Sequence, residues 1–480
     1  MRQREVQRVD TVVHGGTVVT STETHEGAVA IQGEKVVAVG PRELLPPADR
    51  YIDATGKYVL PGAIDVHIHL GTPEEGRADD WRSGTIAAAH AGVTSIVSFA
   101  GADISKKETP PQAVIRFKEH VSKQSVVDFS FHANLANESY IFEGLERFIP
   151  EAIRLGAPSF KMFMQYGGRV SDKFLAKAME VIAANGGLAQ VHCENGDACE
   201  YLEEKALAEE RVRPLDWPST RPPWTEEEAV RRAIYFAEIT KCPLHVVHLS
   251  SHGALEEIKE AQRRGVKVWT ETCPQYMLLS EKDMERLGPF IKISPPVRPA
   301  DMIHQNAMWR GLEHGYISVV ASDHAPKHKE DQEHGWQNIF MNPQGGRVPL
   351  GSPNVQTMVP LAYSEGVVKR GLPITWIARA LAENPARIFG LYPRKGAIRP
   401  GSDADLLIID PEPEYIVRAV DLQGNSKYNP YEGWKLKGRP WMTLLRGKVL
   451  LSQGKLEQRA GYGQFLQAGS PHPPIAGRGN

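Results

Sequence analysis

The sequence predicts an α/β fold in which a TIM-type (β/α)8 barrel carries a small β-sandwich domain formed by both chain ends. Three observations support this prediction. The middle of the chain alternates short apolar runs with amphipathic stretches, which is typical of βαβ units and a parallel sheet. There are eight such runs, the number that a closed barrel requires. Both ends of the chain consist of short β segments broken by glycines, which indicates one β domain built from the two termini.

The eight apolar runs are short and bounded by polar or glycine-containing segments, so each predicts one barrel strand. The amphipathic, Ala- and Glu-rich stretches between them predict helices, for example 81–92, 171–187 and 226–240. Two more helices are predicted after the last run, over 355–371 and 374–389. The predicted strands are 64–69, 93–99, 126–133, 157–163, 187–192, 243–248, 268–273 and 317–322.

The predicted β segments at the two chain ends have a similar pattern of short apolar runs. VDTVVHGGTVVT and GAVAIQGEKVVAVG lie near the N-terminus, and GSDADLLIID and WMTLLRGKVLLSQGK lie near the C-terminus. From Gly469 onward the chain is rich in Pro and Gly, which predicts a disordered or draped tail. The predicted division is a β-sandwich domain over 1–57 and 397–460, a barrel over 58–396, and a tail over 461–480.

Composition excludes several classes of protein. The 480 residues are 41% hydrophobic, which is ample for a large core. The 56 basic and 58 acidic residues nearly cancel, so we expect no nucleic-acid partner. Neither a membrane span nor a secretory signal is expected, because no long apolar run occurs and the N-terminus is charged. The four cysteines form no CxxC pair, which argues against a thiolate zinc site and favours a reduced, cytoplasmic protein.

Ionisable side chains follow five different predicted strands. In a barrel enzyme the active site lies at the C-terminal ends of the strands, so these groups are expected to converge on one mouth. A single HxH pair among 17 histidines would be weak evidence, but chance placement at five strand ends is implausible. The six residues are His67, His69, Lys161, His192, His248 and Asp323.

The residue types predict a site for two divalent metal ions. Side chains at i and i+2 of a strand share a face, so His67 and His69 can bind one ion together. Imidazoles with a carboxylate suit Zn²⁺, with Mn²⁺ or Co²⁺ as alternatives. An ammonium on Lys161 would be repelled by such ions, and a carbamate formed with CO₂ (N6-carboxylysine) would instead bridge them. A hydroxide shared by the two ions would be the nucleophile, and Asp323 would act as general base and acid.

Three other histidines receive different predictions. His245 lies three residues before His248, so it is expected on the opposite strand face, packed against helices. His132 ends the third predicted strand and is interpreted as structural. His324 follows Asp323 directly, and its role stays open between supporting the metal site and contacting the substrate.

Ordered motifs over residues 10–455 resemble the dihydropyrimidinase and hydantoinase branch of the amidohydrolase superfamily. The motifs are GAIDVHIHL, DDWRSGTIAAAHAGVTSIVSF, SFKMFMQY, AQVHCENGD, CPLHVVHLSS, KISPPVR, ASDHAP and NPARIFGLYPRKGAIRPGSDADLLIIDP. The resemblance implies opening of a ring C–N amide bond in a cyclic ureide, a dihydropyrimidine or hydantoin, to an N-carbamoyl amino acid. It also implies a homotetramer.

The resemblance assigns roles residue by residue. It implies that His67, His69 and Asp323 hold one metal ion, and that His192 and His248 hold the other, with carboxylated Lys161 as the bridge. Tyr166 would donate a hydrogen bond to the oxyanion of the tetrahedral intermediate. The backbone of Ser294 would contact the substrate ring.

Two departures from the family pattern concern substrate binding. The family commonly has an IPNGxPGIE-like segment whose asparagine backbone binds the substrate, and here VPLGSPNVQ places Leu350 at that position. The preceding loop, 327–347, is longer than usual, and HLGTPEEG replaces a more apolar loop after the first strand.

Other functions remain as alternatives. Allantoinase or a related cyclic amidohydrolase stays open, because SDHAP suits it equally well. Dihydroorotase is disfavoured, since Gly71 stands where that branch has an arginine. A non-catalytic scaffold of the same fold is disfavoured because all six ligand positions are present.

Overall fold

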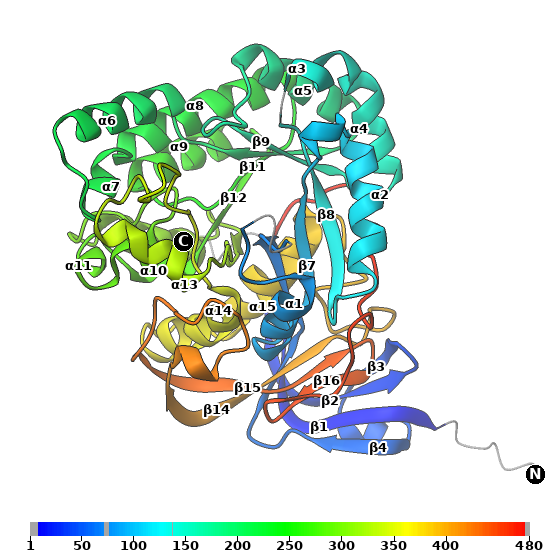
Figure 1. Cartoon of the computed structure of the whole chain (residues 1–480). Coiled ribbons are helices and arrows are strands. Elements are labelled where there is room, and N and C mark those ends of the chain that lie inside the picture. Colours follow the sequence, from blue (N-terminus) through cyan, green and yellow to red (C-terminus); the bar gives the residue numbers. More distant parts are fainter. Residues whose placement is uncertain (1–7, 72–75, 137, 476–480) are drawn as a thin grey trace, which may run out of the picture.

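Eight parallel strands form the body of the computed structural model, which describes residues 8–71, 76–136 and 138–475 (Figure 1). Each strand lies on one of the predicted apolar runs. The chain closes the barrel after the last strand, where the His69 N–H donates to the His324 carbonyl at 2.7 Å. The strands are β6 (Ala63–Ile68), β7 (Val93–Ala100), β8 (Asp128–Asn134), β9 (Ser159–Phe163), β10 (Leu188–His192), β11 (Leu244–Val246), β12 (Val268–Thr272) and β13 (Val319–Val320).

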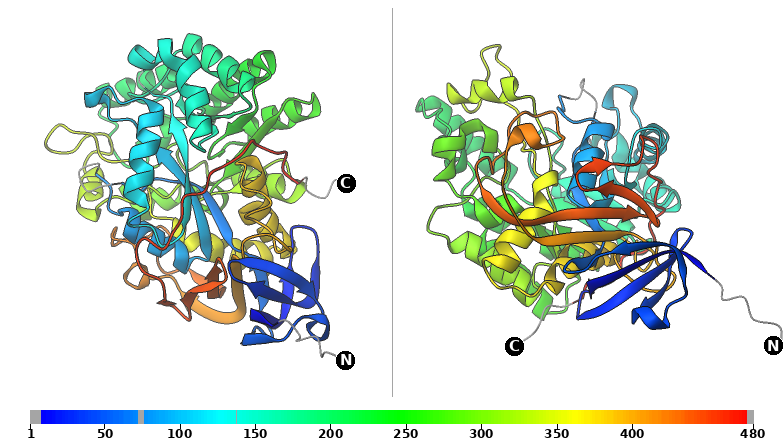
Figure 2. Two further views of the ribbon diagram at one scale, coloured as in Figure 1. Left: turned by 90° about the vertical axis from the view of Figure 1, so that its right-hand side faces the viewer. Right: turned by 90° about the horizontal axis from the view of Figure 1, so that it is seen from below.

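Helices follow the strands and surround the barrel, as Figures 1 and 2 show. The first begins where Asp80 and Ser83 form a reciprocal capping box, which satisfies free N–H groups at the helix start. No helix in the described segments is long and apolar enough to cross a membrane. The main helices are α1 (Trp81–His90), α2 (Pro110–Val121), α4 (Leu145–Arg154), α5 (Asp172–Ala184), α6 (Gly196–Ala208), α8 (Pro223–Thr240), α9 (His252–Arg263), α12 (Ile303–His314), α14 (Val355–Leu361), α15 (Thr375–Ala378) and α16 (Asn384–Ile388).

The two chain ends form one nine-stranded mixed sheet beside the barrel, with blue N-terminal strands next to orange and red C-terminal strands (Figure 2). β5 joins the two ends, because it pairs with β1 on one side and β14 on the other. The predicted fold class, a barrel with a small β domain from both ends, is confirmed. The sheet comprises β1 (Val9–Val19), β2 (Thr24–Gln32), β3 (Lys35–Gly40), β4 (Ala48–Asp53), β5 (Tyr58–Pro61), β14 (Leu406–Ile416), β15 (Lys435–Leu445), β16 (Lys448–Ser452) and β17 (Lys455–Leu456).

The segment after the last strand lies against the barrel as far as residue 475. Phe465 packs on Phe129 and Phe131 of β8, with ring centroids 5.9 Å apart in both pairs, and Leu466 is fully buried. The prediction of a tail also covers residues 476–480, which lie outside the described residues.

A buried ion cluster joins the barrel to the terminal sheet. The Lys395 ammonium is fully buried and lies 2.6 Å from Asp128, 3.0 Å from Asp403 and 2.7 Å from Asp405. The carboxylates hold the pKa of Lys395 above its usual value against the opposing effect of burial. Arg446 pairs with Asp128 from the other side. Because Asp128 begins β8 and Asp405 directly precedes β14, the cluster fixes one domain on the other.

Replacing Lys395 with Met should destabilise the protein strongly. Removing one partner from a buried ion cluster leaves its carboxylates uncompensated, at a cost of about 3–5 kcal/mol. Chemical denaturation would show this as a lower free energy of unfolding. Lys448→Met, at an exposed site on β16, is the matched control and should unfold like the wild type. Equal stability of the two variants would contradict a structural role for the cluster.

Candidate active site

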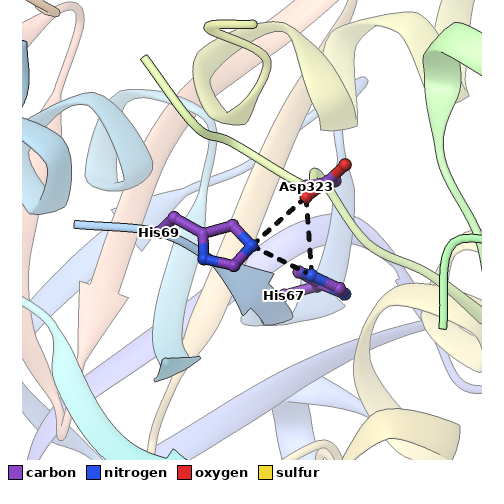
Figure 3. A group of neighbouring side chains, drawn as sticks. All are labelled: His67, His69 and Asp323. Carbon is purple, nitrogen blue, oxygen red and sulfur yellow. Dashed lines mark hydrogen bonds and ion pairs between the residues drawn. The ribbon is translucent and has the colours of Figure 1, made fainter. Parts of the chain in front are cut away.

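Three of the predicted ligands meet at the mouth of the barrel (Figure 3). His67 lies in β6 and His69 just beyond it, and Asp323 follows β13, the neighbour across the barrel closure. The Nε2 atoms of the two histidines are 3.2 Å apart, and each lies 3.4 Å from Oδ1 of Asp323. Three potential ligand atoms therefore face one small volume.

A second pair lies next to this trio. His192 ends β10 and His248 follows β11, and Nδ1 of His192 lies 2.9 Å from Nε2 of His248. The His248 ring is also close to His67, with 5.2 Å between ring centroids. The structure thus brings the five histidine and aspartate positions together as two adjoining groups.

Lys161, in β9, lies in the same region. Its side chain is buried, and Nζ lies 5.0 Å from the centroid of Phe99 and 5.1 Å from that of Phe163. Phe99 also stacks on His69 at 4.6 Å. Within the described residues no carboxylate lies within ion-pair distance of this amine, and burial lowers its pKa.

Three site residues have left-handed backbone conformations, which non-glycine residues seldom adopt. The φ angles are 38° for His248, 46° for Asp323 and 69° for Tyr166. Such conformations cost free energy and cluster at functional sites. Here they occur where the chain leaves the strands β9, β11 and β13.

The donor set fits divalent cations. Nδ1 of His67 is hydrogen-bonded to Glu271, and Nε2 of His192 is 2.8 Å from Glu194. If these outer nitrogens carry the protons, the inner nitrogens of His67 and His192 present lone pairs toward His69 and His248. A ring nitrogen lone pair about 3 Å from a second ring nitrogen is stabilised either by the N–H of the partner ring or by a cation between the rings, and neutral imidazoles held by carboxylates are the usual ligands of such metals.

Burial sets the protonation of the site. It lowers the pKa values of His67, His69 and His248 well below the usual value, which keeps these imidazoles neutral. Burial raises the pKa of Asp323, against the opposing influence of Lys161. A bound cation would reverse that shift by favouring the carboxylate form.

Two supporting carboxylates, Glu194 and Glu271, did not emerge from the sequence analysis. Both are fully buried. Glu271 lies in β12 and binds His67 and His245, and Glu194 binds His192 and also accepts a 2.6 Å hydrogen bond from the Ser294 hydroxyl. A signal was available: Glu271 lies in the seventh apolar run, and Glu194 is two residues after His192.

The prediction for His245 is wrong. Its Nε2 lies 3.0 Å from Glu271, and its ring contacts Phe389 at 5.1 Å. Strict alternation fails because β11 ends at Val246 and the backbone turns at His248. His132 is buried between Ser159 and the Val66 carbonyl, a structural environment that agrees with its interpretation.

His324 joins three loops around the mouth. Its Nδ1 accepts hydrogen bonds from the backbone N–H groups of Asn354 and Val355, and its Nε2 lies 3.2 Å from Asp79. Asp79 belongs to the loop after β6, and it also accepts from the Asn425 N–H. His324 therefore holds loops in place and is itself buried.

Two of the three residues assigned to substrate contact, Tyr166 and Ser294, lie near His192. The Tyr166 ring is 5.1 Å from the His192 ring, and burial, with Glu194 nearby, raises the pKa of its hydroxyl well above 10, so it stays a proton donor. Ser294 contacts Glu194. Leu350 is half-buried and precedes Gly351, whose φ of 134° and close approach to the Ala325 carbonyl require glycine.

Comparison with known proteins gives consistent matches over the whole chain. The model of the amidohydrolase family matches residues 58–450. A D-hydantoinase from Ralstonia pickettii is 35% identical over 96% of this chain and 99% of its own length. An allantoinase from Escherichia coli is 33% identical over 95% and 98%. The structure of a dihydropyrimidinase from Brevibacillus agri superposes with a TM-score of 0.89 at 34% identity, covering 97% of this chain and all of the other.

The chain therefore belongs to the amidohydrolase family. Among the relatives, hydantoinases and dihydropyrimidinases match over almost their whole length, so the predicted branch of the superfamily is confirmed.

Replacing Glu194 with Gln should weaken metal binding. The substitution removes the charge that orients His192, and loss of such a partner typically costs about 10- to 100-fold in metal affinity. Competition with a chelator, followed by metal analysis, measures this. Glu204→Gln, at an exposed site on helix α6, which begins two residues after Glu194, should retain wild-type affinity. Unchanged affinity in Glu194→Gln would show that the carboxylate does not support the ligand.

Proposed function

We propose that this enzyme, a cyclic amide hydrolase, opens the ring C–N amide bond of a cyclic ureide, a dihydropyrimidine or hydantoin, and releases an N-carbamoyl amino acid. The observation that carries the proposal is the meeting of His67, His69, Asp323, His192 and His248 beside Lys161. Tyr166 and Ser294 lie on one side of this cluster. The hydantoinase and dihydropyrimidinase relatives support the substrate class.

Each side chain at the site has a separate role in the proposed reaction. Bound divalent ions would supply Lewis-acid polarisation of the amide carbonyl and a more acidic water. Asp323 takes a proton from the attacking water as its oxygen bonds to the carbonyl carbon. Tyr166 donates a hydrogen bond to the oxyanion that forms. Asp323 then returns the proton to the ring nitrogen as the C–N bond breaks, and the ring opens to a carboxylate.

Binding of the ring is assigned to backbone groups at Ser294 and Leu350. An amide or imide ring offers alternating donors and acceptors, which backbone N–H and C=O groups can match at fixed positions. Leu350 needs no polar side chain for this role, because the contact uses only its backbone.

Two metal ions per chain are proposed, with Zn²⁺ preferred and Mn²⁺ or Co²⁺ as alternatives. His67, His69 and Asp323 would hold one and His192 and His248 the other. Lys161 would be N6-carboxylysine and bridge them. Its burial without an ion-pair partner in the described chain supports this, since a carbamate converts an isolated amine into two ligand oxygens.

Allantoinase activity is the second candidate, supported by the 33% identity to the Escherichia coli allantoinase. Allantoin is itself a hydantoin bearing a ureido group, so the same atoms would react. The scaffold alternative has no comparable support.

The remaining assignments concern organisation. We propose a homotetramer, as the resemblance implies, and a cytoplasmic location, which four buried unpaired cysteines support. The domain division proposed is 1–57 with 397–460, 58–396, and 461–480. We propose to end the N-terminal part of the β domain at residue 61 instead of 57, because β5 pairs within the terminal sheet.

A substrate panel tests the proposed reaction. Metal-loaded protein should hydrolyse dihydrouracil or 5-substituted hydantoins and leave dihydroorotate intact, because Gly71 provides no cation for its carboxylate. Ring opening can be monitored through the loss of ultraviolet absorbance, and the product can be confirmed by mass spectrometry. Allantoin is the discriminating member: turnover of allantoin alone would favour the second candidate. No turnover of any cyclic amide would contradict the proposal.

Replacing Lys161 with Ala should remove bound metal and activity together. The variant lacks the bridging oxygens, while the cavity it creates admits a small carboxylate. Added acetate should therefore restore part of both metal content and turnover. Lys267→Ala, at an exposed site before β12, should behave like the wild type. Full activity of Lys161→Ala without acetate would rule out the bridging role.

A further inference from the structure

Lys292 is a buried amine that the proposed reaction does not use. Its side chain is 1% exposed and follows the 3-10 turn Gly288–Ile291. Nζ lies 4.5 Å from the centroid of the Trp217 ring, and the Trp217 indole N–H in turn donates to the Ile293 carbonyl at 2.8 Å. The lysine is therefore held in one orientation by the tryptophan, which is itself fixed to the same segment.

Lys292 forms hydrogen bonds with the chain on both sides of Leu350. The Lys292 ammonium donates to the Val348 carbonyl at 2.7 Å, and the Lys292 carbonyl accepts from the Gly351 N–H at 2.9 Å. Ser294 lies only two residues further along. A single residue thus connects the two backbone positions, Ser294 and Leu350, that are assigned to the substrate ring.

A buried lysine at position 292 is expected to lower the free energy of unfolding, because its charge is desolvated. Burial, with the nearby Arg221 guanidinium, lowers its pKa to about 7. Arg221 stacks on the same tryptophan at 3.5 Å and pairs with Glu203, which also binds Arg347 from the long loop. The charged groups facing the amine are therefore cationic or already paired, and a methionine would fill the same space without the cost of desolvating a charge.

We propose that Lys292 is a positioning residue that sets the register between Ser294 and the backbone at Leu350, and so controls recognition of the substrate ring. The proposal rests on the proposed function for the identity of the ring. Lys292 does not touch the reacting atoms; it acts through the loop that it holds. One hydrogen bond from the side chain and one to the backbone carbonyl of Lys292 hold this loop, which departs from the family pattern, in a defined backbone position.

Lys292→Met tests the proposal, because Met keeps the apolar stem and removes the donor. KM for a cyclic amide should rise roughly three- to tenfold, the worth of one hydrogen bond, while kcat and metal content stay within about twofold. The melting temperature should stay close to the wild-type value, because removing the desolvation cost of the buried amine offsets the loss of one hydrogen bond to the Val348 carbonyl. Lys282→Met, at an exposed lysine ten residues earlier, is the matched control.

A second measurement is independent of turnover. Backbone hydrogen exchange over residues 345–353 should be faster in Lys292→Met than in the wild type, with exchange in the barrel strands unchanged. If no cyclic amide is hydrolysed by the wild type, the proposed function fails, and exchange alone decides whether Lys292 holds the loop. Unchanged exchange overturns the inference. Faster exchange with unchanged KM also overturns it, as does a joint loss of melting temperature, metal and kcat, which indicates a general structural role.

Discussion

The close approach of ring nitrogens at the barrel mouth is the constraint on which the rest of the site depends. Nitrogens of His67 and His69 face each other at 3.2 Å, and those of His192 and His248 at 2.9 Å. Burial lowers the pKa values of these imidazoles, so each ring carries a single N–H, and Glu271 and Glu194 already occupy one nitrogen of His67 and of His192. A divalent cation at the mouth would bind the inner nitrogens of both rings in each pair.

The fold supports this arrangement from two directions. Parallel strands bring their C-terminal ends to one mouth, so groups far apart in sequence become neighbours. Behind them, Glu271 and Glu194 bind the outer nitrogens of His67 and His192 and thereby fix which nitrogen faces inward. Glu194 also reaches Ser294. One carboxylate therefore connects a proposed metal ligand, His192, with a residue proposed for substrate contact, Ser294.

The sequence predicted the architecture and the convergence of the ligands well, because both depend on periodicity. An apolar run followed by a reactive residue places that residue at the mouth whatever the loop details. Prediction failed where alternation ended: His245 was assigned to the outer face, but the short strand β11 stops before His248 and the backbone turns. Long-range partners such as Glu271 and Lys292 depend on contacts between distant segments, which periodicity does not reveal. The loop bearing Leu350 is defined by such contacts, so its place could come only from the structure.

Metal content is the most direct test of the central claim that this mouth is a cation site. Protein purified without chelators from cells supplied with zinc should be analysed by elemental mass spectrometry, together with a variant in which His67 and His69 are both replaced by Ala. The account predicts about two divalent ions per wild-type chain and a clear loss in the variant. Fewer than one ion per chain in active protein, or equal content in the two, would contradict it.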